Sequence, residues 1–522
     1  MRPSPLLLAL AVLAAACGGN SSSSGGKCPA TPCASGLTCQ SDGTCVQIVT
    51  PDGGFATCTS EDVKPVGDSA LANAGSQAAG AAYVVKRETH TVGETMSFDV
   101  SPGTASITIV QQAIKAPDTV IFVSGGSGLQ LDNTAVPHTV NSPDGSIHFD
   151  DVQDGQLLQP DYTTKPIYFF SDSPVTGTLT IPNTTKGVSL VGANGLPGGT
   201  WTAQISDYAW ECAVGIGKGQ TFDACSGGAS DSVYDVTVIA KPTSVGIPAS
   251  GTLDVVLNFV ATSVGSPTPQ PLNAAEAPND ADVQRMVQTL KGFYLKQSIT
   301  VNVTYQDAPS AVQQRYATGV NIDQNGACSD LSQLLTNGVK GNVLNIFLVP
   351  TLVETTSTGG RVTTVGIDGT IPGPASIGGT VASGAVVSVE DLRVGSGTSR
   401  CASTLNITGC GADETAYIVA HEGGHFLGLY HVTEKYGFEF DPLAGTPTCK
   451  CTTCSLHPTT CADPSLGAPT STSDIVSVSE CLSPSTGCGG GDNLMFWLLA
   501  PGSAGNLADE QGQVMRANPA VH

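Results

Sequence analysis

The chain has 522 residues and a formal net charge of −23, from 44 acidic and 21 basic side chains. A surface this acidic repels phosphate backbones and anionic lipid headgroups, which excludes nucleic acid as an expected partner. Charged residues make up only 12% of the chain and glycine is abundant, a composition typical of an exported, β-rich protein and not of a cytosolic helical one.

Residues 1–17 have the features of a bacterial export signal. Arg2 precedes an apolar run from Leu6 to Ala16 that is too short to span a bilayer as a helix. The small residues before Cys17 resemble a lipobox, and this resemblance implies cleavage before Cys17 and lipidation of its thiol. We therefore expect an outer-membrane or cell-surface lipoprotein anchored in the membrane through Cys17, or a secreted chain. An ordinary signal peptide with a chance cysteine is the alternative.

Cysteine usage agrees with export to an oxidising compartment. Setting Cys17 aside leaves an even number of the 17 cysteines, as expected for disulfide pairs. Residues 18–60 combine a Gly/Ser tether with a Cys-rich segment whose pairing the sequence leaves open: Cys28, Cys33, Cys39 and Cys45. Two further pairs are expected to close loops: Cys212 with Cys225, and Cys401 with Cys410.

Residues 61–265 have the pattern of an antiparallel β-sandwich. In residues 252–260, apolar side chains occupy every second position from Leu253 to Phe259, a period typical of a strand. Turn residues separate many such runs, with no long helical pattern between them. Residues 195–212 and 249–259 are loosely similar to the jelly-roll accessory domains of secreted proteases. The other predicted strands are 105–110, 119–123, 166–170, 177–181, 187–192, 200–205 and 234–240.

A Pro/Ser-rich stretch at 263–273 is the predicted linker to a second domain at 274–522. In the second domain helical and strand patterns alternate, which indicates an α/β (α+β) arrangement. We predict helices over 280–295 and 329–338, and strands over 298–305, 342–349 and 384–389.

Three of the eight histidines lie in one segment, HEGGHFLGLYH. A helix is predicted over 412–428, with acidic residues in its first turn, where their charge suits the helix dipole. His421 and His425 then lie one turn apart on the same face. Two imidazoles on one face can bind the same zinc ion, and Glu422 beside them can act on its bound water.

A catalytic zinc site needs a third protein ligand and one open position. His431 lies six residues beyond His425, on a different side of a continued helix. Gly428 tolerates the left-handed conformation that ends a helix, and the resulting bend can return His431 to the metal. The segment therefore predicts zinc held by three neutral imidazoles.

HEGGHFLGLYH fits the signature HExxHxxGxxH and so resembles the metzincin zinc metalloproteases. The residues of the motif look most similar to those of the pappalysin-type branch. The resemblance covers roughly residues 275–500 and implies a metzincin-like catalytic domain that cleaves extracellular proteins or peptides, with Glu422 activating the water. It also implies a Met-turn beneath the zinc, for which Met495 is the candidate. By the same analogy, the strand near 384–389 presents an open edge to an extended peptide.

Some residues depart from the family pattern. Gly423 stands where the signature usually has a bulky apolar residue, and it and Gly424 each weaken the helix by roughly 1 kcal/mol. The loop 441–449 resembles a calcium- or loop-fixing segment of the same branch, but Gly445 replaces an aspartate, so Ca²⁺ is the weaker cofactor prediction beside Zn²⁺. A downstream cluster is interpreted as disulfide-bonded, with a structural zinc site as the alternative: Cys449, Cys451, Cys454, His457 and Cys461.

The leading prediction is a zinc endopeptidase, but two other functions stay open on the sequence. A catalytically inactive relative would bind zinc and serve as a surface binding or adhesion module. A latent enzyme would carry its β-domain over the cleft until N-terminal processing removed it.

Overall fold

The computed structural model describes most of residues 81–432 and 490–522, together with 37–39, 45–47, 68–69 and 441–446. The main gaps inside the first range are 116–120, 124–128, 151–161, 170–175, 211–224, 227–230, 323–328 and 356–360. Cys212, the predicted partner of Cys225, and the cluster from Cys449 to Cys461 lie outside the described residues, so neither disulfide prediction is tested. Within the described residues, no helix is both long and apolar enough to cross a membrane.

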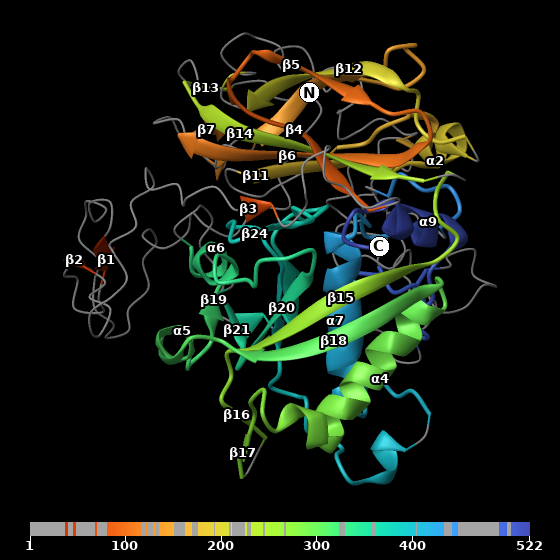
Figure 1. Ribbon diagram of the computed structural model, residues 1–522. Helices are drawn as coiled ribbons and strands as arrows, with labels where there is room; N and C mark the ends of the chain where they lie inside the picture. The colour runs from red at the N-terminus through yellow and green to blue at the C-terminus, as the bar shows by residue number, and fades with distance from the viewer. Residues whose placement is uncertain are drawn as a thin grey trace, which may run out of the picture.

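Two four-stranded antiparallel sheets make up the N-terminal part (Figure 1). The first has the order β10-β9-β12-β5: His148–Asp150, Ala135–Asn141, Gly199–Asp207 and Thr95–Val100. The second has the order β11-β6-β14-β4: Thr176–Ile181, Thr104–Lys115, Val233–Pro242 and Tyr83–Thr91. Side chains of both sheets share one apolar core, which confirms the antiparallel β prediction for this part.

Alternation of side chains explains the first sheet. In β5, Met96, Phe98 and Val100 are buried while the residues between them are exposed. The second sheet differs, because β14 is buried along most of its length. Figure 1 shows why: this sheet lies between the first sheet and the C-terminal part, so both of its faces are covered.

Two strand predictions in this part are wrong. Residues 166–169, within the predicted strand 166–170, have no regular structure. Residues 187–191 belong to helix α2 (Thr185–Val191), where the Thr184 hydroxyl accepts a hydrogen bond from the Gly187 N–H. The buried Val188 and Val191 lie three positions apart, a spacing that suits a helix face as well as a short apolar strand.

The C-terminal part is built on a five-stranded mixed sheet of order β18-β15-β20-β25-β23. The strands are Ile299–Asp307, Gly251–Phe259, Leu344–Val349, Ala385–Ser388 and Gly366–Asp368. The first four are parallel, and β23 is antiparallel to β25. The mixed sheet with its helices confirms an α+β architecture for the chain.

Strand β15 belongs to the C-terminal sheet. The prediction that its alternating pattern forms part of the N-terminal sandwich is wrong, because β15 pairs with β18 and β20 in the second sheet. A period of two identifies a strand without identifying its partner. The expected linker at 263–273 contains a two-stranded ribbon, β16 (Ser263–Val264) with β17 (Gln270–Pro271).

Helices cover both faces of this sheet. On one face, α4 (Ala281–Leu295) packs against β18, and α7 (Gly411–Phe426) packs against β20, β25 and β23. In β20, Ile346 and Leu348 face these helices. Phe347 and Val349 face the opposite core, which includes α5 (Ser310–Arg315) and α6 (Asp330–Leu335). Helix α7 therefore lies between the sheet and the rest of the C-terminal chain.

The remaining described elements are short. A last helix, α9 (Asp509–Ala517), precedes the end of the chain, where the His522 N–H donates to the Thr252 carbonyl at 2.8 Å. The other strands are β1 (Leu37–Cys39), β2 (Cys45–Gln47), β3 (Asp68–Ser69), β7 (Ile121–Val123), β8 (Leu129–Leu131), β13 (Cys225–Ser226), β19 (Val320–Asn321), β21 (Leu352–Thr355), β22 (Arg361–Val362) and β24 (Ile377–Gly378).

Candidate metal centre

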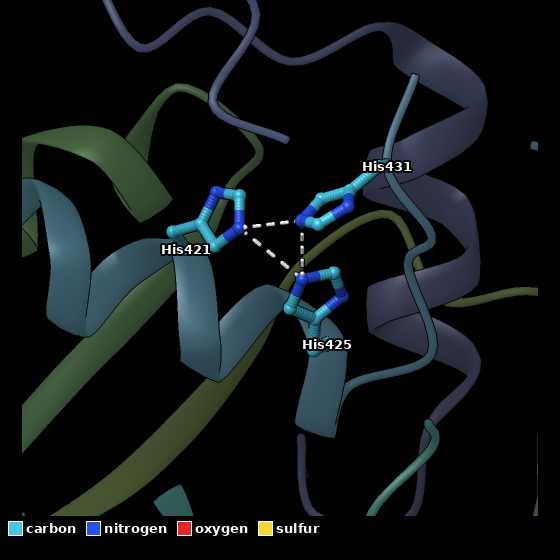
Figure 2. A group of neighbouring side chains, drawn as sticks. All are labelled: His421, His425 and His431. Carbon is cyan, nitrogen blue, oxygen red and sulfur yellow. Dashed lines mark hydrogen bonds between the residues drawn. The ribbon is translucent and has the colours of Figure 1, made fainter. Parts of the chain in front are cut away.

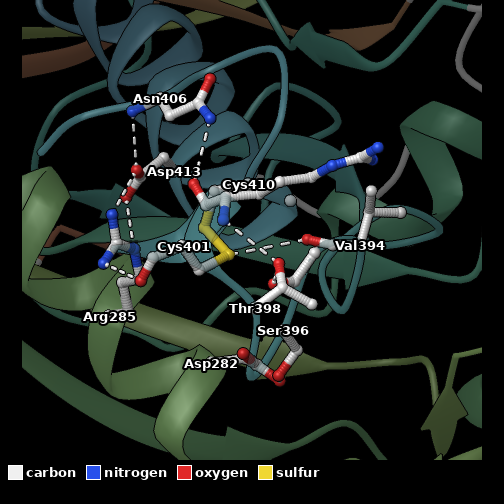
Figure 3. Close-up of a disulfide and its surroundings, with 12 residues drawn as sticks. Asp282, Arg285, Val394, Ser396, Thr398, Cys401, Asn406, Cys410 and Asp413 are labelled. Carbon is white, nitrogen blue, oxygen red and sulfur yellow. Dashed lines mark hydrogen bonds and ion pairs between the residues drawn. A yellow bond between two sulfur atoms is a disulfide. The ribbon is translucent and has the colours of Figure 1, made fainter. Parts of the chain in front are cut away.

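The start of α7 is fixed by a covalent and an ionic contact (Figure 3). Cys410, at the N-cap, forms the predicted disulfide with Cys401. The fully buried Asp413 carboxylate accepts hydrogen bonds from Arg285 of α4, at 2.9 Å from Nε and 2.6 Å from Nη2. These contacts fix the first turn of the helix whose last turns carry the histidines.

Glu414, also in the first turn, is half-buried, and this burial together with the Asp391 carboxylate raises its pKa to about 7. The ordinary value is 4.5, so the folded chain binds this proton more tightly than the unfolded chain does. The protonated carboxyl group therefore favours the fold relative to the ionised one. This contribution is complete below pH 4.5 and is lost as pH rises through 7, where the buried group becomes charged.

Glu414→Gln replaces the carboxyl group with a neutral amide, so it is expected to raise the thermal unfolding midpoint at pH 8 and to leave it nearly unchanged at pH 4. A midpoint lowered at pH 8 would contradict this.

The three histidines of the motif converge on one point (Figure 2). The Nε2 atom of His421 lies 3.0 Å from that of His431 and 3.2 Å from that of His425, and the third separation is 3.1 Å. Within the described part of the chain, no second group of three or more metal-ligating side chains converges in this way. The arrangement can hold a metal ion.

Hydrogen bonds on the far side of two rings fix their orientation and tautomer. His421 Nδ1 lies 2.6 Å from the Leu494 carbonyl oxygen, and His425 Nδ1 lies 2.7 Å from the Leu429 carbonyl oxygen. A carbonyl only accepts, so Nδ1 carries the proton and Nε2 presents a lone pair to the centre. Burial lowers the pKa of His421 to about 3 and that of His425 well below its ordinary value. Both rings are therefore neutral, as metal ligands must be.

The predicted bend at Gly428 is present. Helix α7 ends at Phe426, and Gly428 has φ +104°, a region that favours glycine. Its N–H donates to the His425 carbonyl at 2.8 Å. The chain turns here and brings His431 to the two helical histidines.

Met495 lies directly against the histidine helix. A Cβ built on Gly424 would lie 2.6 Å from the Met495 sulfur, so the absence of a side chain there permits this close approach. Likewise, a Cβ on Gly423 would collide with the Tyr294 hydroxyl, which donates to the Ala420 carbonyl at 2.9 Å. The two glycines that weaken the helix in isolation therefore let α4 and the 490–497 segment pack onto it.

Glu422 is buried, with 7% of its surface exposed, and lies against β23. A Cβ on Gly366 would lie 2.5 Å from Glu422 Oε1. Burial, with a further contribution from the Asp368 carboxylate, raises the pKa of Glu422 well above its ordinary value. A carboxyl group with a raised pKa beside a metal centre is suited to accepting a proton and releasing it again.

The expected open edge at 384–389 is wrong. Strand β25 pairs with β20 on one side and with β23 on the other, so it has no free edge. The edge at this end of the sheet belongs to β23, the strand that contacts Glu422.

Three residues that support the centre carry no recognisable signal in the sequence. Tyr417 stacks on the His421 ring at a centroid distance of 6.5 Å, and its hydroxyl donates to the Asn493 carbonyl at 3.0 Å. The Asn493 amide donates to Gln511 of α9 at 2.9 Å, and its oxygen accepts from the Met495 N–H at 2.8 Å. These contacts join distant segments, so no local spacing predicts them.

The loop predicted as a weaker calcium site is held by hydrogen bonds in its described part, 441–446. The Asp441 carboxylate accepts from the Leu443 N–H at 3.1 Å. The Gly445 N–H donates to Glu510 Oε2 at 3.1 Å. Glu510 of α9 thus holds the loop at Gly445.

Comparisons with known proteins do not identify a family for this chain. No family model and no curated protein matches the chain. Metalloproteinase-II from Bacteroides fragilis is 14% identical with a TM-score of 0.19, over 40% of this chain and 57% of that one. The protein YxiM from Bacillus subtilis is 9% identical with a TM-score of 0.11, over 49% of this chain and 46% of that one. The chain thus spans about half the length of each structure.

Neither likeness identifies a fold at TM-scores this low. The residues of this chain form a buried centre of converging imidazole nitrogens that can hold a metal ion, with a carboxyl group beside it.

Proposed function

We propose that this chain is a zinc-dependent endopeptidase of the metzincin type. The observation that carries the proposal is the convergence of three Nε2 atoms at 3.0–3.2 Å beside Glu422. Nitrogen lone pairs that face one another repel, and a cation at their centre removes the repulsion. In tetrahedral coordination with zinc–nitrogen bonds of about 2.0–2.1 Å, donor atoms lie about 3.3 Å apart. The triangle of nitrogens is therefore close to the size that zinc requires.

The chain's own residues suit peptide hydrolysis. Zinc bound to His421, His425 and His431 would supply polarisation of the scissile carbonyl and activation of a water. The Glu422 carboxylate would take a proton from that water as it attacks the carbonyl carbon. The same carboxyl group would then give the proton to the leaving amine nitrogen, which completes the cleavage.

Substrate would bind along the edge strand β23. β23 is the last strand of the described five-stranded sheet, and its Gly366 lies against Glu422. An extended peptide that adds to a sheet edge gains main-chain hydrogen bonds, and here its backbone would pass the metal centre. Protein or peptide chains are therefore the proposed substrates, and nucleic acid is not.

The finer assignments belong to the same proposal. We propose a metzincin-like catalytic domain closest to the pappalysin-type branch over 274–522, extended to include β15, with Met495 in the Met-turn. A jelly-roll-like accessory domain would precede it within 61–265, after the tether and Cys-rich segment at 18–60. Residues 1–17 would direct export, with Cys17 as the lipid anchor at the outer membrane or cell surface.

Metal analysis combined with a general protease assay tests the proposal. We expect purified protein to contain one zinc ion for its three-histidine cluster and to cleave unfolded protein substrates. A chelator should abolish cleavage, and added zinc should restore it. Cleavage that persists after complete metal removal would contradict the proposal. Zinc binding without cleavage of any substrate would instead favour the binding or adhesion module.

A further inference from the structure

His431 is the ligand that lies outside α7, and the loop before it decides where its ring lies. The backbone is held before His431, where the Leu429 N–H donates to the Gly424 carbonyl at 3.0 Å. It is held again after His431, where the Val432 N–H donates to the Met495 carbonyl at 3.1 Å. Between these two points lies Tyr430, whose side chain is 4% exposed. Whatever packs against Tyr430 therefore constrains His431.

Tyr168 of the N-terminal part packs against Tyr430. The two ring centroids are 5.0 Å apart with an interplanar angle of 71°, an edge-to-face contact. Both side chains are buried, and Ile371 packs against them. This small apolar cluster joins the N-terminal part to the loop of the third histidine.

Tyr168 is itself held firmly. The buried Asn183 side chain accepts a hydrogen bond from the Tyr168 N–H at 3.1 Å and donates one to the Tyr168 carbonyl. Two residues later, the Thr185 N–H donates to the Pro442 carbonyl at 3.1 Å, and its hydroxyl donates to Glu510 at 2.6 Å. Tyr168 is thus hydrogen-bonded to Asn183, and the neighbouring Thr185 is hydrogen-bonded to the C-terminal part.

The N-terminal part also holds the end of the chain. The buried Lys241 ammonium of β14 donates to the carbonyls of Arg516 and Val521, and to that of Asn518 at 3.1 Å. The Ser106 hydroxyl of β6 donates to the Ala517 carbonyl. Removing the N-terminal part would leave these four carbonyl groups at the end of the chain without their hydrogen-bond donors. The two parts are therefore built as one unit.

We propose that Tyr168 is a positioning residue for His431, and that the N-terminal β part is a permanent component of the metal centre and not a removable cover. The inference rests on the proposed zinc site but goes beyond it, because it assigns a role in metal binding to a residue about 260 positions before the ligand. Tyr168 limits the motion of Tyr430, and Tyr430 holds the adjacent His431 toward His421 and His425.

The test is the zinc dissociation constant of the full chain, measured by competition with a chromogenic chelator. Tyr168→Ala is expected to raise the dissociation constant by roughly 10-fold, the effect typical of losing a group that orients a metal ligand. Tyr168→Phe keeps the ring and should stay within about twofold of wild type. Phe98→Ala is the matched control, because it also removes a buried aromatic ring from the N-terminal part, in strand β5. It should lower the thermal unfolding midpoint without changing the zinc dissociation constant.

A double-mutant cycle with His431→Ala separates positioning from general loosening. If Tyr168 acts through His431, Tyr168→Ala should cause no further loss in a chain that already lacks that imidazole. An equal loss in both backgrounds, or no loss in the wild-type background, would overturn the inference. If Tyr168→Ala does not fold, Tyr168→Leu keeps apolar volume and carries the same expectation of weaker binding. A wild-type chain that binds no zinc would instead refute the proposed function.

Discussion

Glu422→Gln is expected to lower kcat/KM for a protein substrate by roughly 10²–10⁴-fold while zinc content stays at the wild-type level. The amide has the size and shape of the carboxylate, so the buried side chain can keep its place against Gly366. It cannot accept a proton from the attacking water, so the chemical step loses its general base. Steady-state kinetics with metal analysis on the same preparation measure both quantities.

Glu414→Gln is the matched control. It makes the same chemical change on the same helix, two turns before Glu422 and away from the three imidazoles. Its kcat/KM at neutral pH should stay within about twofold of wild type. Wild-type turnover in Glu422→Gln would show that another group activates the water, or that the cleavage comes from a contaminant.

The convergence of the three histidines was predictable because their relation is local. His421 and His425 are one helical turn apart, and any helix brings them together. The bend at Gly428 follows from a single residue with a positive φ. Three ligands from one 11-residue segment therefore need no knowledge of the rest of the fold.

The partners that orient those imidazoles were not predictable from spacing. The Leu494 carbonyl accepts from His421 across more than 70 residues, and Asn493 depends on Gln511 of a separate helix. The same limit explains β15, whose alternating pattern is correct but whose partners follow it along the chain. Local pattern identifies an element, and only packing decides which element lies beside it.

Short apolar runs were the other source of error. The run 187–192 suits a strand, yet the Thr184 cap and the buried pair Val188 and Val191 make it helical. By helix propensity alone, the glycines at 423 and 424 reduce the stability of the helix. In the folded chain they are contact points for Tyr294 and Met495, so their effect depends on neighbours that the sequence does not specify.

Arg285→Met is expected to lower the free energy of unfolding by about 3–5 kcal/mol, the cost of leaving a buried charge without its partner. The Asp413 carboxylate is fully buried and is also bonded by the Thr289 hydroxyl and the Asn406 N–H, each at 2.9 Å. Those two neutral donors cannot compensate a full negative charge. Arg285 also donates to the Cys401 carbonyl at 2.9 Å, so the disulfide loop before α7 loses a contact (Figure 3). Urea unfolding followed by circular dichroism measures the change.

Two variants distinguish the buried charge from the lost contacts. Arg315→Met breaks a more exposed ion pair with Asp330 and should cost no more than about 1 kcal/mol. Adding Asp413→Leu to Arg285→Met removes the unpaired carboxylate and should recover part of the lost stability. If Arg285→Met costs no more than Arg315→Met, the Asp413 carboxylate is not stabilised by Arg285. In that case the start of α7 depends on the Cys401–Cys410 disulfide, and reduction of that disulfide should then destabilise the chain more than the loss of Arg285 does.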